Sequence, residues 1–362
     1  MQNNTKPIES RTAGSRKGQS GFTLLEVLVA MVIFIVVTGA VWGVLRAAMV
    51  SRSALNQNVS LAKNVRLGLN VIGRDTYNAG FGYPLANTVV LPDNRISTLL
   101  GIPVDTDTSR DTIPPITAGN NITLSTFNTT AGTRTDQITL LFKDSTFNVT
   151  GAVGPPDTRV SVPLNINAAS TTSGGIDEIV PISGSNTSCR VNDIYLITGN
   201  TGSTLGLATA LSGTNIVQFA NGDLLGFNQT GTSGPLRAIT LPASLQRVKM
   251  VTYFVAADGT LTRREFANIL PAQAFVDEPL VYGVENFQIQ YIMDDGTLND
   301  NPSAGPDGIA GTADDTSASL AAVRQVRYTI SVRSIDLNAS GQYYRETMTS
   351  TFSTRNLGYD AN

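Results

Sequence analysis

The sequence has no histidine and only one cysteine among its 362 residues. Histidine is the commonest general base and a usual zinc ligand, so its absence excludes imidazole zinc sites and the serine–histidine and cysteine–histidine nucleophile pairs. Cys189 has no partner for an internal disulfide, and its role stays open between an incidental buried thiol and a reactive one. Paired carboxylates would be the remaining route to catalysis, and no such pair stands out outside the acidic loop at 294–315, so we expect a protein that is not an enzyme.

Charge is also scarce, since charged residues make up 15% of the chain and the formal net charge is −3. These values exclude a strongly basic nucleic-acid coat and a highly charged disordered chain. No basic or aromatic patch supports binding to nucleic acid. The length allows a sizeable core and more than one packing unit.

Long apolar runs are absent except for one near the N-terminus. Residues 1–21 are polar and mostly basic in charge, whereas residues 22–45 are apolar and carry a single charge, Glu26. A helix over this run rises about 36 Å, enough to cross a hydrocarbon core of about 30 Å. Positive charge before the span predicts that residues 1–21 stay in the cytoplasm and that the rest is translocated.

Residues 21–27 (GFTLLEV) resemble the cleavage and methylation motif of type IV prepilins and of type II secretion pseudopilins. The resemblance implies that residues 1–21 are a leader that a prepilin peptidase removes by cutting after Gly21. It also implies that Phe22 becomes an N-methylated N-terminus.

Glu26 is a carboxylate inside an apolar span, which is a functional hypothesis by default. The resemblance implies that it neutralises the Phe22 amine of a neighbouring subunit during filament assembly. Either charge left alone in an apolar filament core would be strongly unfavourable. The alternative is that the Glu26 side chain reaches from one end of the span into the headgroups.

Apolar or small residues continue beyond residue 45 in steps of three and four, which predicts one helix from Phe22 to about Asn78. Gly80, Gly82 and Pro84 are expected to end it, so residues 22–80 form the N-terminal helical region. We expect the apolar stripe to pack on the rest of the chain. Its residues are Leu55, Val59, Ala62, Val65, Leu69 and Ile72.

The remaining chain is predicted to be a β-rich head, with polar loops over 81–245 and an antiparallel region over 246–362. Asp258-Gly259 is a favoured hairpin turn. The fold class is therefore α+β, a long N-terminal helix packed on a mostly antiparallel head. The predicted strands are 136–142, 193–198, 215–219, 248–255, 261–266, 281–292, 323–333 and 343–354.

Short segments spread over most of the chain resemble the PilW-type minor pilins. The resemblance implies a minor pilin that helps to initiate or cap a type IV pilus, with prepilin peptidase and other major and minor pilins as partners. It also implies a single-pass inner-membrane subunit with a periplasmic head that later reaches the cell surface. A J-type secretion pseudopilin and a pilus-tip adhesin are the alternatives. The segments are 73–81, 253–255 with 261–263, 283–285 with 288–291, 323–326 and 355–356.

The loop at 294–315 is rich in aspartate, asparagine and glycine and contains no lysine or arginine. Flexible anionic loops of this kind suit Ca²⁺, although the spacing is not that of an EF-hand. We expect Asp307, Asp314 and Asp315 as its ligands. The alternative is a solvated loop between two strands.

Overall fold

The computed structural model divides the chain into two compact units, residues 1–55 and residues 56–362. The described residues are 21–84, 89–102, 108, 110–124, 127, 134–166, 179–182, 188–213, 215–229, 234, 236, 239–269, 272–302, 322–338 and 341–357.

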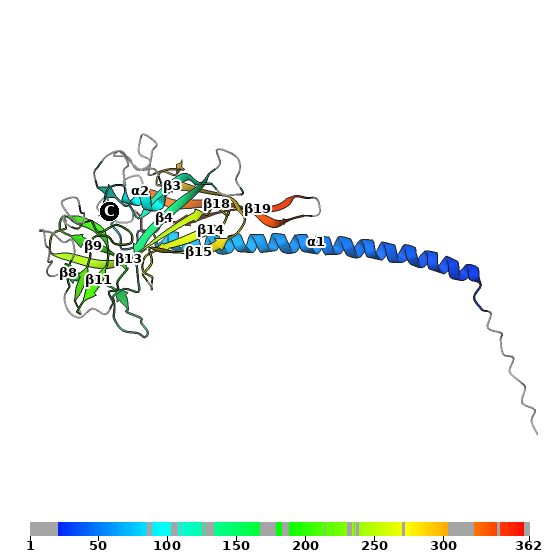
Figure 1. The fold of residues 1–362 in the computed structure, drawn as a ribbon, viewed down its shortest axis with the longest axis horizontal. Helices are drawn as coiled ribbons and strands as arrows, with labels where there is room; N and C mark the ends of the chain where they lie inside the picture. Colours follow the sequence, from blue (N-terminus) through cyan, green and yellow to red (C-terminus); the bar gives the residue numbers. More distant parts are fainter. Residues whose placement is uncertain are drawn as a thin grey trace, which may run out of the picture. The chain divides into compact units, whose positions relative to one another are not determined.

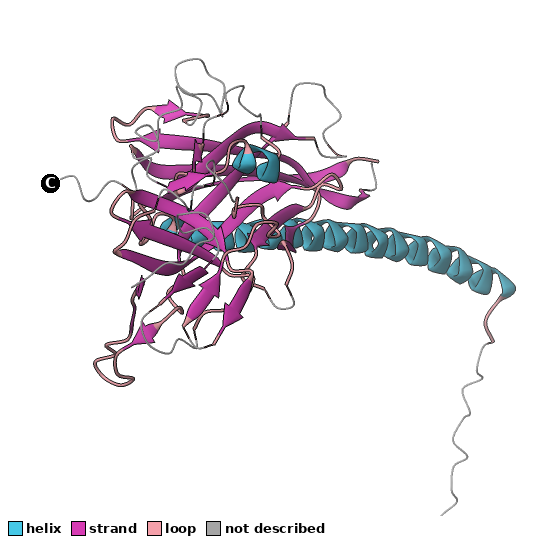
Figure 2. Ribbon diagram, turned by 60° about the vertical axis from the view of Figure 1, so that its left-hand side comes forward, coloured by secondary structure: helices cyan, strands magenta, loops and turns pink. Residues whose placement is uncertain are grey.

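One long helix, α1 (Leu24–Asn78), begins in the first unit and ends in the second (Figure 1). It stops where Gly80 and Gly82 take left-handed backbone angles of φ 78° and 63°, conformations that glycine adopts without strain. The extent predicted from the sequence is confirmed to within two residues. Among the described residues the only other α-helix is α2 (Arg95–Leu100), which is short (Figure 2).

The second unit is built mainly of strands, and the largest sheet runs in the order β15-β14-β13-β9-β10-β1-β2. β4 joins it by pairing with β13 and β3, and β7 pairs with β13. Every pairing is antiparallel except that of β1 with β10. The strands are β1 (Val89–Leu91), β2 (Asp111–Thr112), β3 (Ile116–Thr123), β4 (Thr135–Lys143), β7 (Leu164–Ile166), β9 (Ile194–Gly199), β10 (Gly202–Leu207), β13 (Ala243–Val255), β14 (Leu261–Phe266) and β15 (Phe275–Val281).

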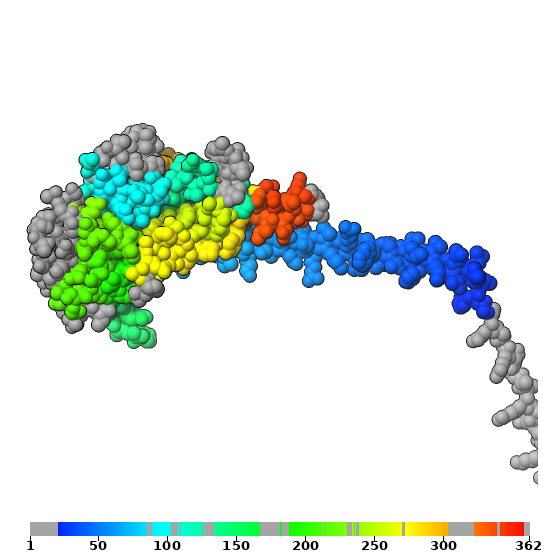
Figure 3. Space-filling model, viewed as in Figure 1, coloured from blue at the N-terminus to red at the C-terminus, as the bar shows by residue number. Residues whose placement is uncertain are grey.

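A second antiparallel sheet runs in the order β17-β16-β18-β19, and two small sheets pair β11-β12-β8 and β5-β6. On the face in Figure 3, the strands β9–β11 (green), β13–β15 (yellow) and β18–β19 (red) form much of the described surface. The α+β class is thereby confirmed. These strands are β5 (Val149–Thr150), β6 (Val160–Ser161), β8 (Ile179–Pro181), β11 (Ala210–Ser212), β12 (Ile216–Gln218), β16 (Val284–Met293), β17 (Leu298–Asn299), β18 (Val323–Leu337) and β19 (Tyr343–Ser353).

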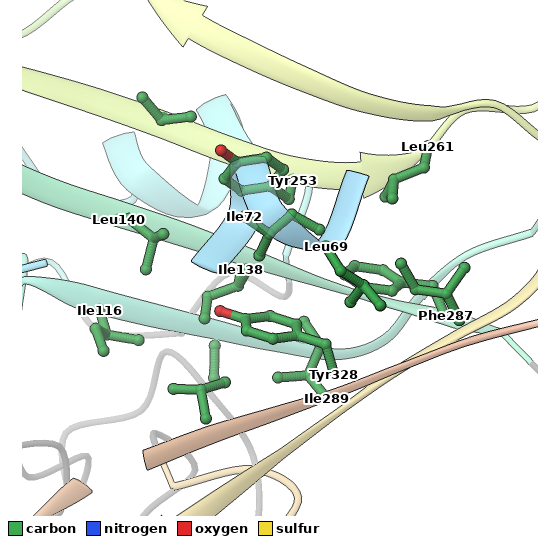
Figure 4. Close-up of a cluster of buried hydrophobic side chains, with 14 of the residues drawn as sticks. Leu69, Ile72, Ile116, Ile138, Leu140, Tyr253, Leu261, Phe287, Ile289 and Tyr328 are labelled. Atoms are coloured by element: carbon green, nitrogen blue, oxygen red, sulfur yellow. The ribbon is translucent and has the colours of Figure 1, made fainter. Parts of the chain in front are cut away.

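The last five turns of α1 form part of the largest hydrophobic core. Val65, Leu69 and Ile72 are almost fully buried against side chains of both large sheets. Leu69 and Ile72 lie between Tyr253 of β13 and Tyr328 of β18 (Figure 4). Burying three such side chains contributes about 5–8 kcal/mol, so the sheets hold this part of the helix firmly.

The predicted apolar stripe is wrong at its N-terminal end. Within the second unit, Val59 keeps 66% of its surface exposed, whereas Leu61 and Ala62 are half-buried. The stripe has the right helical period throughout, but within the second unit the strands cover the helix only from Leu61 onward.

Two strand boundaries also differ from expectation. The stretch predicted as one strand over 281–292 is the end of β15 and the start of β16, separated by a turn at Tyr282 and Gly283. Gly283 has φ 73° and lies against the carbonyl oxygen of Arg333, a close approach that a side chain would block. The strand β13 crosses residue 245, so it belongs to both predicted halves of the head.

Gly73 brings α1 close to the C-terminal strand β19. A Cβ atom at this position would lie 2.2 Å from the ring of Phe352, closer than real atoms approach. The ring therefore occupies the space that any larger residue would need, and the helix can approach β19 only with glycine here.

Gly73→Ala is expected to lower the free energy of unfolding by about 1–3 kcal/mol, because the added methyl group overpacks the contact with Phe352. Urea unfolding of the full chain in mild detergent, followed by near-ultraviolet circular dichroism, measures this. Asn70→Ala, on the exposed face of the same helix, is the control. Adding Phe352→Leu to Gly73→Ala should restore part of the loss; unchanged stability of the single variant would contradict the packing argument.

A buried ion pair fixes the end of α1 to the largest sheet. The carboxylate of Asp75 accepts hydrogen bonds from the Tyr253 hydroxyl at 2.6 Å and from the Arg263 Nε at 3.0 Å. Arg263 also contacts Glu265 and Glu278 at 3.0 Å each. Because Asp75 and Arg263 are nearly excluded from water, each charge depends on its partners for stabilisation.

Candidate functional site

The peptide bond between Gly21 and Phe22 lies just outside the helix. Residues 21–23 precede α1 and are exposed, with 86% of the Phe22 side chain open to solvent. A peptidase requires an exposed, non-helical segment, because the backbone N–H and C=O groups of a regular helix are already hydrogen-bonded to one another. The structure thus places the two predicted processing residues in an accessible strip of chain.

Thr23 and Glu26 form a reciprocal cap at the start of α1. The Glu26 carboxylate accepts hydrogen bonds from the Thr23 amide at 2.9 Å and from its hydroxyl at 3.1 Å. The Thr23 hydroxyl in turn accepts the Glu26 amide at 3.3 Å. This is a capping box, which satisfies two of the amides that a helix start leaves unpaired.

The capping role of Glu26 was missed in the sequence, although the signal was present. A threonine followed three residues later by glutamate, ahead of an apolar run, is the usual signature of a capping box. The predicted pairing with a neighbouring Phe22 concerns a second subunit and stays a prediction. The cap does hold the Glu26 carboxylate within one turn of Phe22.

The turns after Glu26 expose an unusually apolar surface. Among the described residues, α1 is the one helix long and apolar enough to cross a membrane, and its most apolar segment is not buried by the chain itself. A helix of this kind requires lipid or the apolar helices of other subunits around it. Its exposed large side chains include Leu25, Leu28, Ile33, Phe34, Ile35, Trp42 and Val44.

The predicted calcium ligands Asp307, Asp314 and Asp315 lie outside the described residues. Among those described, no cluster of three or more acidic or cysteine side chains could hold a metal ion. The described part of the acidic loop has local partners: Asp295 accepts hydrogen bonds from Thr297, and Asp300 accepts one from Gln290. The calcium site stays a prediction.

Cys189 is buried, with 5% of its surface exposed. Burial raises the pKa of its thiol to about 11. The thiolate is the reactive form of cysteine, so this residue is protonated and unreactive near neutral pH. The burial of Cys189 therefore favours an incidental buried thiol over a reactive one.

Asp136 links the two large sheets. Its carboxylate accepts the amide of Asn121 at 2.8 Å and the amide of Ile289 in β16 at 2.7 Å. Burial removes water from the charged form and raises the pKa of Asp136 to about 6, despite these two hydrogen bonds. The folded protein therefore holds this proton more tightly than the unfolded chain does.

The free energy of unfolding is expected to fall as pH rises from about 4 to about 6, where unfolded Asp136 is ionised and folded Asp136 is not. Above about pH 7, where the folded carboxyl is also ionised, this contribution no longer changes. Relative to Asp136→Asn, which cannot titrate, the native chain should lose about 2–3 kcal/mol between pH 4 and pH 7. Urea unfolding across this range measures the difference; two parallel curves would contradict the assignment.

Comparison with known proteins adds one match, at the N-terminus. The family described as the prokaryotic N-terminal methylation motif matches residues 16–42, which contain Gly21, Phe22 and Glu26. A search of curated proteins finds no match. The motif, together with the membrane-capable helix that follows it, supports a type IV pilin-like or pseudopilin protein that prepilin peptidase processes and that assembles with other pilins.

Proposed function

We propose that the chain is a minor type IV pilin, a structural subunit that helps to initiate or cap a pilus. The methylation motif at the start of an exposed apolar helix carries the proposal. Prepilin peptidase cuts after Gly21 and methylates Phe22, and the mature subunit stays in the inner membrane with its head in the periplasm until assembly.

Assembly in this proposal depends on charge neutralisation in an apolar surrounding. Cleavage creates an ammonium group at Phe22, and Glu26 of the incoming subunit supplies the opposite charge. An ion pair is far more favourable than two separate charges in a medium of low dielectric constant, so the pair sets the register between neighbours. The apolar side chains of residues 24–45 then pack against other helices rather than lipid.

The head contributes shape and surface in this proposal and carries out no reaction. It is fixed to residues 61–78 of α1 by the hydrophobic core and by the Asp75–Arg263 pair. The segment at 73–81, part of the resemblance to PilW-type pilins, supplies the glycine that meets Phe352 and the aspartate of that pair. In this proposal, Gly73 and Asp75 therefore serve to attach α1 to the head.

Mass spectrometry of filaments sheared from native cells tests the proposal. A mature peptide that begins with N-methylated Phe22, found in the sheared fraction, would support a pilus subunit. The same peptide confined to the membrane fraction would favour a J-type pseudopilin of type II secretion instead. Normal filaments that lose adhesion when the chain is deleted would favour the adhesin alternative. A chain still carrying residues 1–21 in both fractions would contradict all three.

A further inference from the structure

A pocket of about 310 Å³ lies on the second unit, where the end of α1 meets β4, β13 and β14. Loop 79–84 is fastened to β4 by backbone hydrogen bonds, from Gly80 to the Leu141 carbonyl and from Lys143 to the Phe81 carbonyl. The walls are therefore regular elements joined by backbone pairing. Its charged lining residues are Arg74, Asp75, Lys143, Asp144, Lys249 and Arg263.

Both carboxylates in the lining are already engaged by the protein. Asp75 accepts hydrogen bonds from Tyr253 and Arg263. Asp144 accepts the amide and hydroxyl of Thr146 and the Nε of Arg247, at 2.7–2.9 Å. The lining thus holds four cations against these two acids, and of the four only Arg263 donates a short hydrogen bond to either acid.

Two of the lining cations make only long contacts with acids among the described residues. The Arg74 side chain is 68% exposed and makes one long contact among the described residues, from Nε to Asp75 at 3.4 Å. The Lys249 Nζ lies 3.6 Å from Glu265, beyond normal hydrogen-bond length. Lys143 donates to the Ser161 carbonyl and adds positive charge to the same wall.

We propose that this pocket binds the carboxylate side chains of an acidic peptide segment on a neighbouring subunit. Arg74 offers the planar fork that carboxylates fit, and Lys249 offers a point charge beside it. Phe81, half-exposed in the lining, provides an apolar surface for the peptide chain. The head of this chain itself carries an acidic excess that a second copy would present, since residues 81–362 contain 25 acidic and 16 basic residues.

The site goes beyond the proposed assembly function, because it belongs to the second unit and does not involve residues 21–26. Its test uses the purified full chain in detergent, with no filament present. The probe is a fluorescently labelled hexaglutamate peptide, measured by anisotropy, and hexaglutamine is the uncharged comparison. A failure of binding here leaves the processing and pairing roles of Phe22 and Glu26 untouched.

Arg74→Gln and Lys249→Gln are each expected to weaken hexaglutamate binding about tenfold, the effect of losing one hydrogen bond to a charged group. Arg66→Gln is the matched control, since it removes the same charge from the exposed face of α1 outside the pocket. Circular dichroism checks that each variant is folded.

Equal weakening by Arg66→Gln would overturn the site in favour of diffuse attraction to a basic helix. Displacement of the peptide by an equal charge concentration of inorganic phosphate would overturn the acidic-peptide assignment in favour of a general anion site. Equal binding of hexaglutamine, or no binding of either peptide, would also overturn it.

Discussion

Replacing Glu26 with glutamine is expected to leave cleavage after Gly21 intact and to reduce incorporation into filaments by roughly a hundredfold, because the neighbouring Phe22 ammonium would lack a counter-charge in an apolar surrounding. Glutamine retains an oxygen that can accept the Thr23 amide, so the helix start is preserved. Immunoblotting of sheared filaments against the membrane fraction measures incorporation, and Glu26→Ala should behave similarly.

Thr23→Ala separates charge from helix capping. It removes the hydroxyl that accepts the Glu26 amide but keeps the carboxylate. Incorporation close to that of the native chain is expected. If Thr23→Ala proves as defective as Glu26→Gln, the helix start rather than the ion pair governs assembly. Normal incorporation of Glu26→Gln would rule out the pairing role.

Replacing Asp75 with alanine is expected to lower the free energy of unfolding by about 3 kcal/mol, because removing one partner of a buried pair leaves the other charge uncompensated. The effect lies at the lower end of the range for such pairs because Arg263 keeps its contacts with Glu265 and Glu278. Tyr253 also loses the acceptor of its 2.6 Å hydrogen bond. Urea unfolding of the full chain in mild detergent measures the loss.

The control for Asp75 is an ion pair on the surface. Asp157 and Arg159 are about half-exposed and 2.7 Å apart, and water and salt screen their attraction. Asp157→Ala should therefore leave stability unchanged. A loss from Asp75→Ala no greater than that from Asp157→Ala would show that the buried pair does not fasten the helix.

Short-range patterns in the sequence predict the structural features that depend only on neighbouring residues, such as helix ends, turns and strand alternation. The end of α1 at the glycines, the hairpin at Asp258-Gly259 and the alternation of β18 are all confirmed, with Gly259 at φ 80°. In β18, Val326, Tyr328, Ile330 and Val332 are buried on one face as expected. Each follows from a backbone preference or from the period of a strand.

Features that depend on distant partners could not be predicted in this way. Nothing near Asp75 in the sequence indicates that Arg263 and Tyr253 will surround it, and nothing near Val59 shows that the strands cover the helix only from Leu61 onward. The strand β15 was only partly recognised because its exposed, acidic, proline-containing sequence lacks a strand alternation. The pocket is likewise made by four elements separated along the chain.

The contacts of α1 with the C-terminal part of the chain, such as that of Gly73 with Phe352, also affect the order in which the parts of the protein fold after synthesis. The Thr76 hydroxyl meets that of Tyr328, 252 residues further along the chain, and the Tyr77 carbonyl meets Asn356, 279 residues further along. Contacts of such long range form late, since most of the chain must first be available. The N-terminal helix is therefore synthesised long before the strands that cover its last turns, and a chain stalled before β13 would present Leu69 and Ile72 to chaperones and proteases.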